Sequence, residues 1–176
     1  TNYGKVVKTM DNIQKINTPY GEIMARKIEY YDNGKVKAAE PEEPVFVSHE
    51  TGLYIAYDNT PLKDEEHKPT LELTENGRIK ALRTIGTGLI CRNKTGEMYR
   101  FGAQWRPDPR GTGANVLVPI RIQFYEDELR VTDSDEQKFV LSLKDYEIQV
   151  DYLTDNIVMG AGCGDCSTCN GCRGTK

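Results

Sequence analysis

Two similar segments, each with an Asn-Gly dipeptide near its centre, constrain the fold of this chain more than any other feature. They read KIEYYDNGKVK at 27–37 and TLELTENGRIK at 70–80, and both alternate apolar and polar residues before the dipeptide. Alternation with a period of two is typical of a strand with one buried face. Asn-Gly favours two-residue hairpin turns, in which both central residues have positive φ. We therefore expect two hairpins with Asn33 and Asn76 in the left-handed region.

A glycine step precedes each of these hairpins. INTPYGEIMA at 16–25 and VSHETGLYIA at 47–56 share an apolar start, a glycine five residues later and a final alanine. Glycine permits tight turns and close approaches of backbone. We expect Gly21 and Gly52 to occupy such positions, so that the repeated unit is a glycine turn, a strand, a hairpin and a second strand.

A third copy of the unit is weaker. RIQFYEDELRV at 121–131 keeps the alternation and an acidic turn but lacks the glycine, so its turn must be of another type. IGTGLIC at 85–91 is a worn copy of the glycine step, with Gly88 at the matching position. The chain then holds about three degenerate repeats.

The coarse reading of the whole chain is nearly all strand, since no stretch shows sustained helical periodicity. Two polar stretches, 58–70 and 106–115, are predicted loops. We expect an all-β fold, an elongated or open antiparallel sheet of about three hairpin repeats over 1–155, followed by a flexible cysteine-rich tail over 156–176. Strands are predicted over 4–9, 22–31, 35–39, 44–48, 53–57, 70–75, 78–84, 88–92, 97–102, 116–125, 128–132, 138–143 and 146–152.

The composition fits a thin sheet and argues against some classes of function. The 176 residues are 38% hydrophobic and 28% charged, which is polar for a thick core. A net charge of −4 without a long basic run argues against nucleic-acid binding. The apolar runs are too short for a membrane helix, and the first residues, TNYGKVVKTMDN, lack the apolar core of a signal peptide. We expect a cytoplasmic protein that binds neither membrane nor nucleic acid.

The stretch TPYGEI…KIEYYDNGKVK resembles a group of uncharacterised bacterial repeat proteins that are MORN-like, in which a Thr-Pro-x-Gly step alternates with a Tyr-x-x-Gly-x-x-Lys hairpin. The similarity is good over 16–37, moderate over 47–80 and weak over 116–131. The Gly-Glu-Trp core and the shorter period of true MORN repeats are missing. The resemblance implies an open, repetitive β-sheet that presents its surface to a protein partner, and it carries no catalytic residues.

No catalytic constellation is visible in the body of the chain. His49 and His67 lie in polar, turn-rich stretches, with neither a Gly-x-Ser-x-Gly elbow nor a His-Glu-x-x-His helix around them. Both are expected to be surface histidines, and no catalytic residue is assigned. Trp105 precedes the loop RPDPRGTG, where it is either a partner anchor or a tryptophan buried at the rim of the sheet.

The chemistry is expected in the tail, where GCGDCSTCNGC places Cys163, Cys166, Cys169 and Cys172 at intervals of three. Disulfides among these residues would close very short loops and constrain the unfolded chain little, so reduced thiols are the simpler interpretation. Thiolates are soft ligands that select zinc, Cu(I) and iron–sulfur clusters. We expect the four thiols to hold such a metal. Cys91 stands alone, and its role stays open.

Zinc and an iron–sulfur cluster are both possible occupants. A zinc site with four thiolates usually joins two separated Cys-x-x-Cys pairs, whereas here only Ser167 and Thr168 lie between the pairs. The run up to Cys169 is similar to the ligand stretch of bacterial ferredoxins, but Cys172 follows after two residues rather than three, and no proline comes next. The tail also lacks large apolar side chains that would shield a cluster, so zinc is slightly favoured.

Other interpretations of the tail are open as well. The thiols could exchange with disulfides, or the tail could be disordered with no single function. The tail could also be a substrate whose cysteines are modified. The sequence therefore favours a non-enzymatic interaction or scaffold protein with a metal-handling thiol tail. The main alternative is a folded leader that carries a modifiable cysteine-rich peptide.

Overall fold

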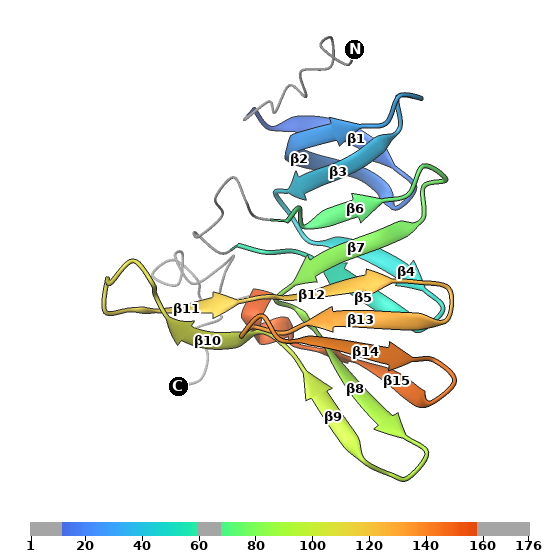
Figure 1. Cartoon of the computed structure of the whole chain (residues 1–176). Helices are drawn as coiled ribbons and strands as arrows, with labels where there is room; N and C mark the ends of the chain where they lie inside the picture. The colour runs from blue at the N-terminus through green and yellow to red at the C-terminus, as the bar shows by residue number, and fades with distance from the viewer. Residues whose placement is uncertain (1–11, 60–67, 158–176) are drawn as a thin grey trace, which may run out of the picture.

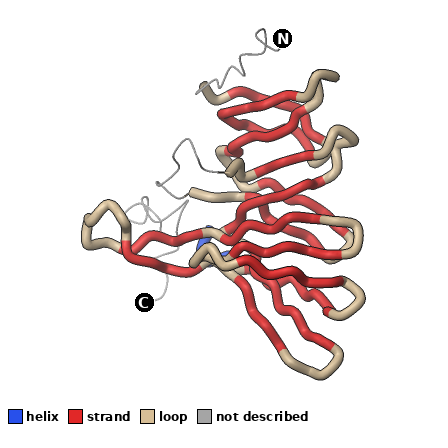
Figure 2. The backbone as a smooth tube through the Cα atoms, in the orientation of Figure 1, coloured by secondary structure: helices blue, strands red, loops and turns tan. Residues whose placement is uncertain are grey.

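The computed structural model describes residues 12–59 and 68–157. Antiparallel strands make up nearly all of the regular secondary structure in this part, and a short helical turn at 154–157 follows the last strand (Figure 2). The expected all-β fold with open antiparallel sheets is confirmed. The predicted strand at 4–9, most of the loop at 58–70 and all four tail cysteines lie outside the described residues.

An open sheet of eight strands forms the larger layer, and every neighbouring pair in it is antiparallel (Figure 1). Three groups of strands, each local in sequence, meet in this sheet through two pairings between distant segments, β3 with β6 and β7 with β12. In spatial order the strands are β1 (Gln14–Thr18), β2 (Gly21–Tyr30), β3 (Val36–Pro41), β6 (Leu71–Leu73), β7 (Ile79–Thr84), β12 (Ile120–Phe124), β13 (Glu128–Thr132) and β14 (Lys138–Ser142).

Three smaller sheets complete the structure. The hairpin of β4 (Val45–His49) and β5 (Gly52–Ala56) lies behind the middle of the large sheet (Figure 1). A three-stranded sheet has the order β15 (Tyr146–Tyr152), β8 (Thr87–Asn93) and β9 (Met98–Phe101). The hairpin of β10 (Gln104–Pro107) and β11 (Asn115–Val118) projects from the body, on the side away from the β12–β13 turn, and we call it the arm.

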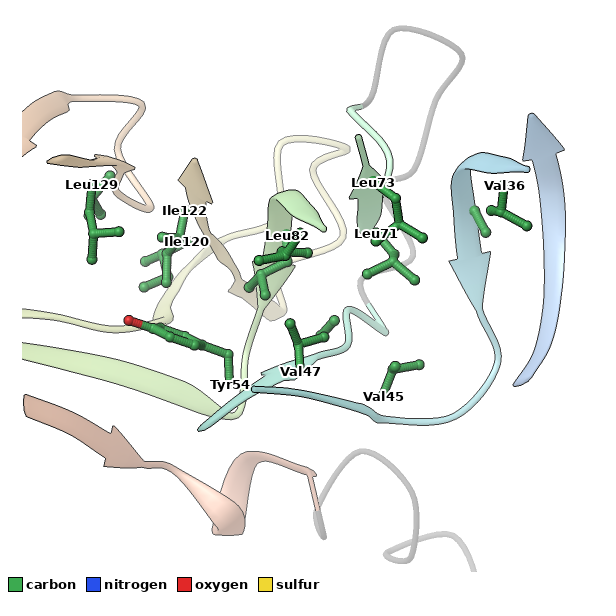
Figure 3. Close-up of a cluster of buried hydrophobic side chains, with 14 of the residues drawn as sticks. Val36, Val45, Val47, Tyr54, Leu71, Leu73, Leu82, Ile120, Ile122 and Leu129 are labelled. Carbon is green, nitrogen blue, oxygen red and sulfur yellow. The ribbon is translucent and has the colours of Figure 1, made fainter. Parts of the chain in front are cut away.

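The core lies between the large sheet and the smaller layer, because one face of each strand is apolar. In β4 the alternation is plain: Val45 and Val47 are 3% and 0% exposed, whereas Phe46 between them is 59% exposed. Figure 3 shows Val45, Val47 and Tyr54 pointing toward side chains of the large sheet. Full burial of one such aliphatic side chain stabilises the fold by about 1.5–3 kcal/mol. The side chains labelled on the large sheet are Val36, Leu71, Leu73, Leu82, Ile120, Ile122 and Leu129.

The two Asn-Gly hairpins form, but the predicted turn type is wrong. Asn33 and Asn76 do not have positive φ; the glycines after them do, with φ of 83° at Gly34 and 80° at Gly77. Each loop is a turn closed by the glycine N–H, followed by the glycine itself in the left-handed region. The amide oxygen of Asn33 accepts a hydrogen bond from the backbone N–H of Lys35 at 2.9 Å, which holds the asparagine in a right-handed conformation.

The same loop geometry occurs four times in the described chain. In each copy the first residue donates its N–H to the carbonyl of the fifth, and the fourth residue donates its N–H to the carbonyl of the first. The first two copies belong to the predicted repeats, and the other two do not. In the last copy Glu136 takes the glycine position, with φ of 64°. The four loops are 31–35, 74–78, 93–97 and 133–137.

The glycine steps also form turns, but they lie in different sheets. Gly21 and Gly52 have positive φ and close the β1–β2 and β4–β5 hairpins. The first hairpin belongs to the large sheet, while the second belongs to the smaller layer. Gly88 lies in β8, where a Cβ would come within 2.7 Å of the carbonyl oxygen of Phe101. The third turn, at 125–128, differs in type as expected, since Tyr125 donates its N–H to Glu128 across a two-residue loop without positive φ.

Strand boundaries depart from the prediction in three places. The single strand predicted at 116–125 is two strands, β11 and β12, which belong to different sheets on either side of Pro119. Proline has no N–H to donate to a ladder, so a strand ends there readily. β1 and β10 were not predicted as strands, and β10 occupies part of the stretch predicted to be a loop.

Candidate functional site

The start of the tail is fixed against the body by the residues that precede it. The N–H of Leu153 donates to the carbonyl of Gly86 at 2.9 Å, and the side-chain amide of Asn156 donates to the carbonyl of Ile85 at 2.8 Å. A Cβ on Gly86 would lie 2.3 Å from the end of the Ile157 side chain, so a larger residue at this position would displace Ile157. The chain therefore leaves the described body at a defined place, six residues before Cys163.

Cys91 is isolated from solvent in the core. Its side chain is fully buried within β8, and burial raises the pKa of its thiol to about 12. The thiol is therefore protonated at neutral pH, and a protonated thiol is a poor ligand and a poor nucleophile. Cys91 is explained by packing rather than by chemistry.

The described body offers no ready metal site of its own. Within residues 12–59 and 68–157 no three His, Cys, Asp or Glu side chains come together as a ligand set would. His67 lies outside this part of the chain. No helix in the same residues is long and apolar enough to cross a membrane.

Four hairpins meet around an open groove of about 570 Å³, which we call the turn groove. Its position follows from the topology: the β1–β2, β4–β5, β6–β7 and β12–β13 turns lie at the same edge of the two layers. The hydroxyl of Tyr20 accepts the N–H of Ile79 at 2.9 Å, which ties the first turn to the start of β7. The lining residues are 20, 48–50, 74, 78–79 and 124–126.

His49 in this groove is held in one orientation by hydrogen bonds. Its Nδ1 accepts the backbone N–H of Thr51 at 3.2 Å and lies 2.8 Å from the Thr51 hydroxyl, which in turn bonds to the hydroxyl of Tyr54. Because Nδ1 is an acceptor, the neutral ring carries its proton on Nε2. Burial lowers the pKa of His49 against the opposing effect of Glu50, so the ring is neutral at pH 7. Its centroid lies 4.6 Å from that of Phe124.

Charged groups of both signs line the same groove. Within the described chain, the exposed side chains of Glu50, Arg78 and Glu126 make no hydrogen bond or ion pair. Beside them, the guanidinium of Arg130 lies 4.4 Å from the ring centroid of Tyr125 and covers one face of it. The groove therefore combines uncommitted charges with aromatic surface.

Trp105 lies on the arm and is 50% exposed. It faces Leu117 across the β10–β11 ladder, and Leu117 packs with Ile85 and Ala103 in a small second core. Arg106 fixes the base of the arm through a two-pronged ion pair with Asp135, at 2.7 and 2.9 Å. The half-exposed side chain is not the buried rim tryptophan of one sequence interpretation, and its role as a partner anchor stays a prediction.

Sequence reasoning found Trp105 and the glycine turns but missed the turn groove. Every residue that lines the groove lies in or beside a predicted hairpin turn, so the local signal was present. What was missing is which turns meet, because that depends on pairings between distant strands. Comparison of the chain with protein families, with curated proteins and with solved structures found no match.

Proposed function

We propose that this chain is a non-enzymatic interaction protein whose four tail thiols, Cys163, Cys166, Cys169 and Cys172, bind a thiophilic metal. Zinc is the favoured occupant, and an iron–sulfur cluster is the second. Reduced thiols of this kind suit a reducing compartment such as the cytoplasm. The body serves as a platform that binds a protein partner.

The four cysteines at intervals of three carry the metal part of this proposal, and the position of Ile85 supports the role of the body as a platform. Its side chain belongs to the small core that anchors the arm, together with Leu117 and Ala103. Its carbonyl accepts a hydrogen bond from the side-chain amide of Asn156, the first residue of the tail. A partner protein that binds the exposed part of Trp105 would therefore lie near the place where the thiol tail begins. Tryptophan is enriched among the residues that contribute most to binding at protein interfaces.

The body also supports the assignment of the metal to the tail. Cys91 is buried and protonated, and the Nδ1 of His49 is occupied by Thr51. A thiophilic metal that binds this protein with four soft ligands would thus have to use the tail cysteines.

The test is a zinc titration of the reduced, metal-free protein against a chromophoric chelator. The wild-type protein should take up one equivalent of zinc with thiolate ligands, visible with cobalt as a probe ion through its charge-transfer absorption. The variant Cys166→Ser/Cys169→Ser should lose this site, while Cys91→Ala should keep it. Equal zinc uptake by the wild type and the double variant would contradict the proposal.

The alternative is that the body is a folded leader and the tail is a substrate for modification. The fixed start of the tail at Ile157 supports this candidate as well, because a modifying enzyme needs a peptide at a constant place relative to its docking surface. Intact mass of the protein from its native host separates the two. A mass that differs from the encoded one at the cysteines favours modification.

A further inference from the structure

We propose that the turn groove binds a zwitterion with an apolar side chain, that is, a free amino acid or a short peptide. The thiol-tail function makes no use of this groove. Its volume of about 570 Å³ is within the range of small-molecule sites, about 300–1,000 Å³. Mixed polar and aromatic walls of this kind orient a ligand through a few polar groups and hold its body by contact with rings.

The charges of the groove point to a ligand that carries both signs. Arg78 offers a planar guanidinium, which matches a carboxylate through two parallel hydrogen bonds. Glu50 and Glu126 offer carboxylates, which match an ammonium group. A purely cationic ligand would face Arg78 with a like charge, and a purely anionic ligand would face two carboxylates. A zwitterion offers an opposite charge both to Arg78 and to the glutamates that line the groove.

The remaining walls suit the uncharged part of such a ligand. Phe124 and Tyr125 supply aromatic surface. The guanidinium of Arg130 already lies over one face of Tyr125, and a planar or cationic group of a ligand can bind an aromatic face in the same way. His49 is neutral, and its Nε2–H is a hydrogen-bond donor that adds no charge to repel an ammonium group.

His49 and the β1–β2 turn are held in place before a ligand arrives. The hydroxyl of the fully buried Tyr54 bonds to Thr51, and Thr51 orients His49. The hydroxyl of Tyr20 fastens the β1–β2 turn to β7. Side chains that are held in place in this way lose little freedom on binding, and this increases affinity.

The experiment is a titration of the full-length protein, followed by two-dimensional NMR of the backbone amides. The probes are L-phenylalanine and two analogues that each lack one charge, phenethylamine and 3-phenylpropionate. L-phenylalanine should shift the amides around Glu50, Arg78 and Glu126. Each analogue should bind about tenfold more weakly, because one charge-assisted interaction is lost. The dipeptide Phe-Ala is a further probe. Its affinity relative to that of L-phenylalanine shows whether the groove prefers a peptide or a free amino acid.

Variants of the groove test which side chain binds which charged group of the ligand. Arg78→Gln should reduce the affinity for L-phenylalanine to that for phenethylamine and leave phenethylamine binding unchanged. Glu50→Gln/Glu126→Gln should reduce the affinity for L-phenylalanine to that for 3-phenylpropionate and leave the binding of 3-phenylpropionate unchanged. Arg92→Gln is the matched control, since Arg92 is exposed on β8 and does not line the groove. An unchanged amide spectrum in each unliganded variant confirms that the fold is retained.

The result that supports the proposal is this pattern of paired losses at the groove amides. Three results would overturn it: no groove shifts at the highest soluble concentration of L-phenylalanine and Phe-Ala, equal binding of all three single-residue probes, or unchanged discrimination in the charge variants. Equal binding would mean that the groove retains aromatic compounds by contact alone.

Discussion

At the scale of single residues, Glu136 occupies a backbone position that glycine fills in the three other loops of the same geometry. Its φ of 64° places its Cβ close to the following carbonyl oxygen, which costs roughly 1–2 kcal/mol for a residue with a side chain. Glu136→Gly should therefore raise the free energy of unfolding by about 1 kcal/mol. Urea denaturation measures the change.

Gly34→Ala is the reciprocal control for that variant. Gly34 has φ of 83°, and nothing lies within 4 Å of an added Cβ, so any loss of stability reflects backbone conformation alone. A loss of about 1 kcal/mol is expected. If Glu136→Gly unfolds at a lower urea concentration than the wild type, the left-handed conformation of the loop is not what limits its stability.

His49 should make the stability of the protein depend on pH. Its pKa in the folded protein is lowered, chiefly by burial, whereas in the unfolded chain the pKa is about 6.5. Between these two values the unfolded chain binds more protons, so stability rises with pH there. The contribution is complete above pH 6.5 and is lost as the pH falls below 6.5 through the lowered pKa.

The measurement is the free energy of unfolding between pH 5 and pH 7.5 for the wild type and for His49→Gln. The variant should show a flatter dependence on pH, because glutamine cannot take up the proton that breaks the bond from the Thr51 N–H to Nδ1. Parallel pH profiles for the two proteins would show that His49 titrates alike in the folded and unfolded states.

At the scale of elements, a buried ion pair joins the end of β5 to β7. A guanidinium nitrogen of Arg83 lies 3.1 Å from the carboxylate of Asp58, and the two side chains are 10% and 0% exposed. Arg83 also donates to the carbonyl of Lys68 at 3.2 Å. The pair thus connects both flanks of the segment 60–67 to the large sheet.

Removing one member of this pair should leave a buried, uncompensated charge. Arg83→Met is expected to lower the free energy of unfolding by about 3–5 kcal/mol. The double variant Asp58→Leu/Arg83→Met should recover most of that loss, because an apolar pair of similar size needs no charge compensation. Thermal unfolding of both variants tests this; a double variant as unstable as the single one would contradict it.

The elements that sequence reasoning predicted well are the local ones. The hairpins around Gly34 and Gly77 are encoded by neighbouring residues, and alternation places Val45 and Val47 inside. The turn type could not be read in the same way, because the Asn33 side chain competes for a backbone N–H and the following glycine then takes the positive φ. That competition depends on geometry, and the Asn-Gly signal alone does not resolve it.

At the scale of the whole molecule, the pairing of distant strands could not be predicted from the sequence. The large sheet depends on β7 pairing with β12, and the second layer depends on β8 pairing with β15. Such contacts involve long loops and have no local signature. The turn groove could not be predicted for the same reason, because it exists only where four separate turns meet. A common repeat origin for the hairpins stays a prediction.

Thiol accessibility gives a prediction for the folded protein as a whole. After removal of metal with a chelator and reduction, alkylation of the native protein should add four groups, and alkylation of the unfolded protein should add five. Cys91 accounts for the difference, because it is buried and its pKa is raised to about 12. In Cys91→Ala both states should take four groups, as intact mass would show. Five groups on the native wild type would contradict the buried position of Cys91.

The central claim, that the tail is a metal site carried by a β platform, is tested most directly by anaerobic purification from the native host, with elemental analysis and an absorption spectrum of the product. We predict stoichiometric zinc without colour, or iron with a visible charge-transfer band, and in either case loss of the metal from the Cys166→Ser/Cys169→Ser variant. A colourless, metal-free protein with four alkylatable tail thiols would contradict the claim and leave the cysteines to a modifying enzyme.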